Sequence, residues 1–236
     1  MSSDCDHEAI FAAFNSRRSA SRRQAIREAY IDLHADPLLS QMLDQSDDLV
    51  YDKLTIAAHL GDLSGASGDA ALRRAIRTSG PGSRDLRCAS LLALAKRVGV
   101  LATPDLLVGL AAADAAVKDY AVIGLAGAGD DEAWVQVREY LRAVLRRKRR
   151  AHGQSEVTTA LAYLARHASD ASRRSELVAF IRRNWEAIDE AEWFAHLWPD
   201  ADPDGPNVDA VTAPDGAAIQ DWVRQPLFRP LGMPGG

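Results

Sequence analysis

Apolar residues recur along most of the chain at the spacing of one face of a helix. Leu91, Leu94, Ala95 and Val98, for example, fall at positions i, i+3, i+4 and i+7. No stretch alternates apolar and polar residues between hairpin turn signals, as paired strands require. The chain is therefore predicted to be all-α. The pattern predicts helices over residues of about 5–15, 21–35, 47–61, 69–78, 84–99, 103–113, 115–128, 131–149, 155–168, 171–184 and 188–198.

Residues typical of helix ends support these ranges. Ser21 and Thr103 stand where an N-cap side chain would, and Pro104 follows Thr103 in the first turn. Gly99 and Gly129 stand where a residue with positive φ would end the preceding helix. These positions predict caps at both ends of the best-defined helices.

Two stretches share a frame. The first begins at Leu86-Arg87 and the second, 31 residues later, at Val117-Lys118. In both, a small residue comes three positions after the basic one, a Leu-Ala pair follows, and a glycine region closes the helix before a second helix begins. This frame resembles the HEAT repeat, a unit of two helices. The resemblance is clearest over 84–149, extends over 155–184, and is looser over 47–78.

The resemblance implies a right-handed α-α superhelix, a HEAT-like solenoid, of about five helix pairs. The first helix of each pair is flanked by earlier and later units, so it can be apolar nearly all round, whereas the second lines one surface and stays amphipathic. The most apolar segment, 115–128, is interpreted as such a first helix, and 131–149, with Trp134, Val137 and Leu141 on one face, as its partner. The first 40 residues are interpreted as a helical cap.

The composition changes after Trp198-Pro199. We therefore predict a helical repeat domain over 1–199 and a Pro/Gly-rich tail over 200–236, with a short helix at 217–224. Both a docked and a loose tail are consistent with this composition. Residues 192–198 are rich in aromatic side chains, and they are interpreted as the cap of the last repeat, with an exposed binding anchor as the alternative.

Charge and cysteine content narrow the class of protein. The formal net charge of −5 gives no general attraction for nucleic acid or anionic lipid. Cys5 and Cys88 lie far apart with no metal-ligand spacing, which favours a reducing compartment. The N-terminal ten residues carry acids where a signal peptide carries bases, and no apolar run is long enough to span a bilayer. A cytoplasmic protein without membrane association is expected.

The strongest charge signal is the basic run over 145–150. Between 138 and 183 there are twelve basic and four acidic residues, whereas 184–223 holds ten acids and no Lys or Arg. We predict a partner-binding stripe on one helix that continues on the next pair. The stripe comprises Arg138, Arg142, Arg146, Arg149, Arg174 and Arg182. Two alternatives stay open. The basic residues form a solvent-exposed helix C-terminus, where positive charge is favoured by the helix dipole, or the acidic segment covers them within the molecule.

No pattern indicates catalysis. The six histidines have no ligand spacing, the glycine-rich stretches lack the phosphate-binding motifs, and no nucleophile is marked with its base. We predict no catalytic residue, no metal and no cofactor. Some DNA glycosylases are built from HEAT-like repeats of this length, and that alternative would need a buried acid beside Trp134 in a basic groove.

The sequence thus predicts a non-enzymatic module that binds a protein partner along the concave, partly basic surface of its second helices. The alternatives are a HEAT-like DNA glycosylase or other nucleic-acid-binding protein, and an immunity-type protein that neutralises its partner, as small bacterial repeat proteins do. A fold of this kind does not choose among them.

Overall fold

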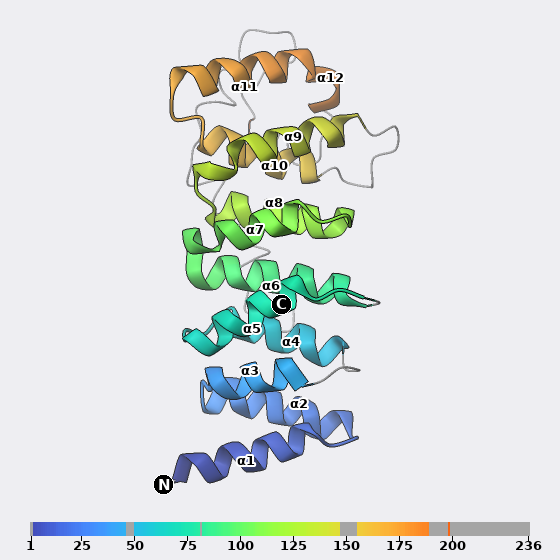
Figure 1. Ribbon diagram of the computed structural model, residues 1–236, viewed down its shortest axis with the longest axis vertical. Coiled ribbons are helices and arrows are strands. Elements are labelled where there is room, and N and C mark those ends of the chain that lie inside the picture. The colour runs from blue at the N-terminus through green and yellow to red at the C-terminus, as the bar shows by residue number, and fades with distance from the viewer. Residues whose placement is uncertain (1, 46–49, 81, 147–154, 189–197, 199–236) are drawn as a thin grey trace. The chain divides into compact units, whose positions relative to one another are not determined.

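The computed structural model describes residues 2–45, 50–80, 82–146, 155–188 and 198 (Figure 1). Throughout these ranges the regular structure is helical, and no strand occurs. The prediction of an all-α protein is confirmed. The described residues form two compact units, one within residues 1–99 and the other within 100–229.

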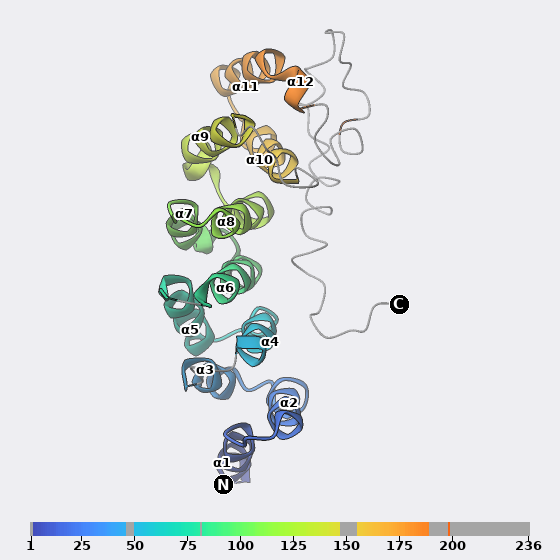
Figure 2. The same cartoon turned by 90° about the vertical axis from the view of Figure 1, so that its right-hand side faces the viewer.

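In the first unit the helices pack in two layers, with α3 and α5 in one and α2, α4 and α6 in the other (Figure 2). Its elements are α1 (Ser2–Phe14), α2 (Ser19–Arg27), the π-helical turn η1 (Glu28–Asp32), α3 (Asp36–Gln45), α4 (Val50–Leu60), α5 (Ala66–Arg77) and α6 (Ser83–Val98). Fully buried Leu39, Ile56, Leu72 and Leu94 come from four of these helices and lie in the core between the layers.

The second unit repeats this arrangement, with α7 and α9 packed beside α8 and α10 (Figure 2). A 3₁₀ turn, η2 (Gly99–Ala102), precedes its first helix. The remaining elements are α7 (Thr103–Leu110), α8 (Ala115–Ala128), the 3₁₀ turn η3 (Asp131–Ala133), α9 (Trp134–Leu145), α10 (Ser155–Arg166), α11 (Ala171–Arg183) and α12 (Trp185–Ile188).

The predicted difference in burial between 115–128 and 131–149 is found, but the two helices do not pack on each other as a pair: α8 packs mainly on α7 and α10, and α9 on α10. In α8, Val117, Ala121, Val122 and Leu125 are buried and face α7 on one side and α10 on the other. In α9 the buried residues keep to one face, and Val135 on the opposite face is 53% exposed. A helix packed on two sides can be apolar over most of its surface.

The helix α3 was missed. No helix was predicted between 35 and 47, yet α3 fills that interval. The Asp36-Pro37 pair at its start is typical of a turn. Proline also suits the first turn of a helix, because the N–H groups there have no acceptor within the helix. Leu39, Met42 and Leu43 supply the buried face. The local sequence alone does not favour a helix here, and packing of the buried face against the rest of the unit stabilises it.

The caps were predicted in part. Gly99 has the expected positive φ of 58°, but Gly129 has φ −66°. Gly129 is required for space instead, because a Cβ there would lie 2.8 Å from the carbonyl oxygen of Leu125. Ser21 lies inside α2, which begins two residues earlier. Buried Thr103 does not cap its own helix, since its Oγ1 accepts a hydrogen bond from the Asp130 N–H at 3.2 Å.

The predicted helix over 188–198 lies, apart from its two end residues, outside the described residues, and so does the tail over 200–236. Trp198 itself is 4% exposed, and Ile188 is fully buried.

Candidate interaction surfaces

The predicted arginine stripe begins on α9, where Arg138 and Arg142 face α11. Glu139 accepts hydrogen bonds from both, at 3.0 Å from Nη2 of Arg138 and 2.7 Å from Nη1 of Arg142. Glu176 of α11 accepts a hydrogen bond from Nη1 of Arg138, and its Oε1 lies 4.0 Å from Nη2 of Arg142. The two arginines therefore tie α9 to α11 as well as presenting charge.

Aromatic rings support the same guanidinium groups. Arg138 and Arg173 each lie 5.5 Å from the centre of the Trp134 ring, and Arg142 lies 5.8 Å from that of Phe180. At these distances a cation is attracted to the face of the ring. The acids and rings together limit the orientations of Arg138 and Arg142, whose side chains are 19% and 34% exposed.

The other described arginines of the stripe are more exposed than Arg138 and Arg142. Arg146 is exposed at the end of α9, and Arg149 lies outside the described residues. On α11, Arg174 is exposed and donates from Nη2 to the carbonyl of Ser169 at 3.3 Å, and Arg182 is exposed. Arg138 and Arg142 thus lie beside α11, and among the described residues their ion pairs are made with Glu139 and Glu176; most of the acidic segment 186–221 lies outside the described residues.

Trp134 lies in the core, which bears on the glycosylase alternative. It is 3% exposed, and its Nε1–H donates to the carbonyl of Leu164 at 3.4 Å. Of the two neighbouring acids, Asp130 caps η3 by accepting from the Glu132 N–H. Asp131 is exposed, and its hydrogen bond from Arg173 lowers its pKa. Neither Asp130 nor Asp131 is the buried acid that the alternative requires, and Trp134 itself is packed in the core.

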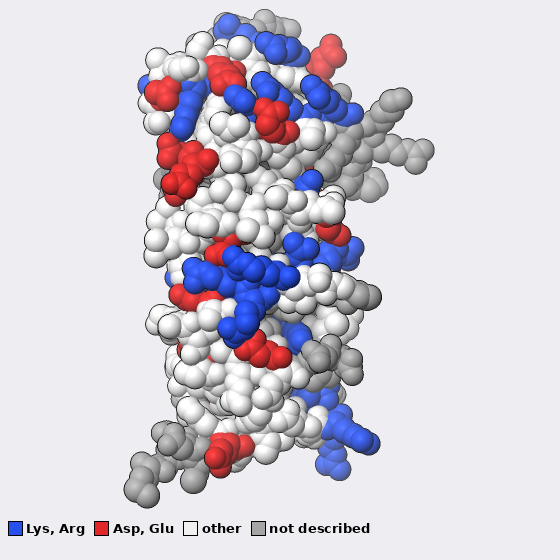
Figure 3. Space-filling model, in the orientation of Figure 1, with Lys and Arg blue, Asp and Glu red and all other residues white. Residues whose placement is uncertain are grey.

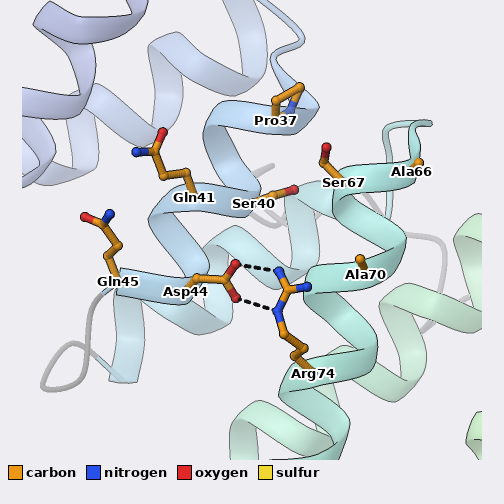
Figure 4. Close-up of a pocket in the computed structure, with 9 residues that line it drawn as sticks. All are labelled: Pro37, Ser40, Gln41, Asp44, Gln45, Ala66, Ser67, Ala70 and Arg74. Carbon is orange, nitrogen blue, oxygen red and sulfur yellow. Dashed lines mark hydrogen bonds and ion pairs between the residues drawn. The ribbon is translucent and has the colours of Figure 1, made fainter.

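A shallow groove lies between α3 and α5 in the first unit (Figure 4). It is an open depression of about 550 Å³. Its lining consists of Pro37, Ser40, Gln41, Asp44, Gln45, Ala66, Ser67, Ala70 and Arg74. The groove exists because the α5 side chains that face it are small until Arg74, which points at Asp44 across the groove (Figure 4).

The two helices that form the groove run parallel. At their starts, the Gly68 N–H of α5 donates to Oδ2 of Asp36 of α3 at 3.0 Å. At their ends, Arg74 donates to Asp44 through Nε at 3.2 Å and Nη2 at 2.5 Å. A hydrogen bond and an ion pair thus join the two helices at the two ends of the groove.

A buried arginine of α6 holds the start of the groove. Arg97, whose side chain is 1% exposed, lies 2.6 Å from Asp36 and 2.5 Å from Asp69. It also donates to the carbonyl groups of Leu60, at 2.5 Å, and Gly65. A buried guanidinium needs this many acceptors because its solvation by water is lost.

Arginine side chains gather over α5 on the face that Figure 3 shows. On α5, Arg74 and Arg77 are exposed, and Arg73 is partly exposed. The three residues fall within two turns of one helix, and Arg74 is the one that lines the groove, where it is paired with Asp44.

A second polar cluster links η1, α4 and α6. Tyr30 stacks on His59 with ring centres 3.9 Å apart and donates to Asp62 at 3.1 Å, and Lys96 pairs with the other oxygen of Asp62. Burial lowers the pKa of His59 to about 4. Its Nδ1 makes no hydrogen bond to any described residue, so this imidazole is held neutral in the packing of the unit.

The described residues contain no group of three or more His, Cys, Asp or Glu side chains placed to hold a metal ion. None of their helices combines the length and the apolar character that crossing a bilayer requires.

Comparison with known proteins assigns no family. No family model matches the sequence, and no curated protein matches it. Among solved structures, the chain is similar to the crystal structure of an engineered protein from the Northeast Structural Genomics Consortium. The sequences are 16% identical, the match covers 93% of this chain and 98% of that one, and the TM-score is 0.49.

The groove was not predicted from the sequence. One of its walls is the missed helix α3, and the other is marked only by Ala66, Ser67 and Ala70, which also suit a buried helix face. The available signal was Arg74, one turn from Ala70 and set between Arg73 and Arg77.

Proposed function

We propose that the chain is a non-enzymatic interaction module that binds a protein partner along the surface of its second helices. In this proposal about five HEAT-like pairs stack as a right-handed solenoid over 1–199, and the second helices line its concave side. Helical-repeat proteins use such extended surfaces for binding.

The observation that carries the proposal is the groove between α3 and α5. Its lining includes Gln41 and Gln45, which are exposed and make no side-chain hydrogen bond within the described part of the chain. Exposed carboxamides can exchange their hydrogen bonds to water for hydrogen bonds to a partner. The groove is therefore a surface at which a partner can make contact.

The arginines of α9 and α11 form a second contact region in the same proposal. Arg138 and Arg142 are held by acids and rings, so little conformational entropy is lost when they bind. Arg146, Arg149, Arg174 and Arg182 would extend this basic region toward an acidic partner.

Affinity capture from an extract of the source organism tests the proposal. The wild type is compared with Arg142→Glu/Arg146→Glu and with Arg74→Glu, each with and without nuclease, at low and high salt. We expect one defined protein with the wild type, reduced at least tenfold in one of the variants and unaffected by nuclease. Capture of nucleic acid alone, with a steep salt dependence, contradicts the proposal.

A further inference from the structure

We propose that α2 and the turn before it bind an acidic segment of a protein, with exposed arginines as the carboxylate receptors. This surface, which we call the α2 basic patch, comprises Arg17, Arg18, Arg23 and Arg27. The inference goes beyond the proposed function, because α2 lies in the layer of α4 and α6, whereas the groove lies between α3 and α5 (Figure 2).

Arginine is concentrated in this part of the chain. Five of the eleven residues from 17 to 27 are arginine, and none of the eleven is acidic. Basic side chains gather where α1 leads into α2, at the lower right of Figure 3. Arg17 and Arg18 are exposed in the turn, and Arg23 and Arg27 are exposed one turn apart on the helix. The patch thus presents four positive charges within a short distance of one another.

These four guanidinium groups are not used by the first unit. None of them makes a hydrogen bond or an ion pair with any residue that the structure describes. The next acid along the chain, Glu28, accepts a hydrogen bond from Gln24 at 2.8 Å. Among the described residues, no ion pair has to be broken before a carboxylate of a partner binds the patch.

A fifth arginine holds the turn in place. The side chain of Arg22 is 14% exposed, and its Nε lies 2.7 Å from Oδ2 of Asp52 of α4. Its Nη1 donates to the carbonyl groups of Ser16 and Arg17, at 3.1 Å each. The Arg18 N–H donates to Oγ of Ser16 at 3.2 Å. Because these bonds fix the backbone that carries Arg17 and Arg18, less conformational entropy is lost when a partner binds.

Most of the patch does not stabilise the helix that carries it. The N-terminus of a helix carries a partial positive charge, so basic side chains are unfavourable there. Arg17 and Arg18 directly precede α2, and the first turn of α2 contains no acid. Arg27 lies in the last turn, where the dipole favours a cation, but Arg23 is one turn away and repels it. Folding does not account for this set of charges, whereas binding of an anionic partner does.

The surroundings of the patch favour a protein segment over a larger polyanion. α1 packs against α2 and carries Asp6 and Glu8, which are both exposed. A nucleic-acid duplex or a membrane surface is wider than one helix, so it would meet these acids as well as the arginines. No aromatic residue lies between 15 and 29 on which a base of a single strand could stack. A narrow acidic chain meets neither obstacle.

A segment of a few residues is long enough to cover the patch. α2 has nine residues and is therefore about 14 Å long, a distance that an extended chain covers in about four or five residues. Side chains two residues apart on such a chain are about 6.6–6.8 Å apart, close to the roughly 6 Å between Arg23 and Arg27 along the helix axis. Acids at alternate positions can therefore each bind one guanidinium through two N–H groups.

Fluorescence anisotropy of labelled ten-residue peptides with the full chain, at 50 mM and 300 mM salt, tests the inference. The probes are a repeat of Ser-Glu, a repeat of Ser-Gln and a ten-residue oligothymidylate, and co-sedimentation tests vesicles that contain anionic lipid. We expect the Ser-Glu probe to bind at least tenfold more tightly than the other two, and more weakly at the higher salt because exposed charges are screened. Arg23→Gln/Arg27→Gln and Arg17→Gln/Arg18→Gln should each weaken its binding at least fivefold.

The first unit supplies a matched control. Arg77 and Arg84 are exposed on α5 and α6, and Arg77→Gln/Arg84→Gln removes the same two charges as each α2 variant. This control should leave the affinity within twofold. Thermal unfolding gives a second measurement: Arg17→Gln/Arg18→Gln should keep or raise the melting temperature, because it removes positive charge beside the start of α2. A loss of binding with retained stability separates the patch from a structural role.

Three results overturn the inference. They are equal binding of the Ser-Glu and Ser-Gln probes, equal weakening by the α2 variants and the control, and binding of oligothymidylate or vesicles with the same dependence on Arg23 and Arg27. The capture experiment that tests the proposed function changes Arg74, Arg142 and Arg146, so either proposal can fail while the other stands.

Discussion

Nη2 of Arg97 donates to Oδ1 of Asp36 at 2.6 Å, although the two residues are sixty-one positions apart in the chain. Arg97 belongs to α6 and Asp36 to α3, and the two side chains are 1% and 7% exposed. Asp36 also accepts the Gly68 N–H of α5. One buried ion pair therefore joins three helices at the start of the α3–α5 groove.

Replacing Arg97 by Met should lower the free energy of unfolding by about 3–5 kcal/mol, because it leaves the buried carboxylate of Asp36 without its cation. Urea unfolding at pH 7, followed by circular dichroism, measures the change. Arg84→Met, which removes an exposed ion pair, should change stability by less than about 0.5 kcal/mol. Equal losses in the two variants would mean that Arg97 is no more buried than Arg84.

Replacing Gly68 by Ala should also destabilise the first unit, although Ala favours helix by about 1 kcal/mol over Gly. A Cβ on Gly68 would lie 2.3 Å from Oδ1 of Asp36 and 2.6 Å from Nη2 of Arg97, so the buried pair must move. We expect a lower melting temperature. Ala70→Gly, on the exposed face of the same helix, tests the difference in helix propensity alone. It should lower the free energy of unfolding by about 1 kcal/mol. A higher melting temperature for Gly68→Ala would contradict this geometry.

Helical periodicity identified most of the helices because burial on one face forces apolar residues to recur every three or four positions. Leu91, Leu94 and Ala95 are all buried as that rule requires. The rule failed at α3, whose first turn carries Asp36 and Pro37. Asp36 looks like a surface residue in the sequence, and its burial depends on Arg97, a residue that no local window includes.

The arginine stripe shows the same limit at a surface. Helical spacing placed Arg138 and Arg142 on one face of α9, and they do face one neighbour together. Their pairing with Glu176 could not be predicted, because it depends on how α11 packs. The position of Trp134 could not be predicted either. A tryptophan at the start of a helix can lie in a groove or in the core, depending on where the neighbouring helix packs.

Stability should fall as the pH drops from about 6.5 to about 4, because burial lowers the pKa values of His59 and His167 to about 4. In that window the unfolded chain takes up protons that the folded chain resists, so unfolding is favoured. The stabilisation is complete above pH 6.5. Around His167, Arg166 and Arg173 lower the pKa further, whereas Asp131 and Asp130 raise it.

Chemical unfolding at pH 7.5 and pH 4.5 separates the contribution of one imidazole. His59→Phe keeps a ring on Tyr30 and removes the titrating group, so the loss between the two pH values should shrink by an amount on the order of 1 kcal/mol. His34→Asn is the control, since His34 is exposed and has a positive φ of 48° that Asn tolerates. The same pH dependence in His59→Phe and the wild type would show that His59 titrates normally.

Trp134→Ala should lower the free energy of unfolding by about 3–5 kcal/mol, as loss of a large buried aromatic side chain does. Trp134→Phe should cost about 1–2 kcal/mol, because Phe fills most of the space but cannot donate to the carbonyl of Leu164. Both effects are measured by urea unfolding. Val135→Ala, one position along α9 and 53% exposed, should change stability by less than about 0.5 kcal/mol. A Trp134→Ala variant that kept its stability and lost nucleic-acid binding would return this residue to an accessible surface and revive the glycosylase alternative.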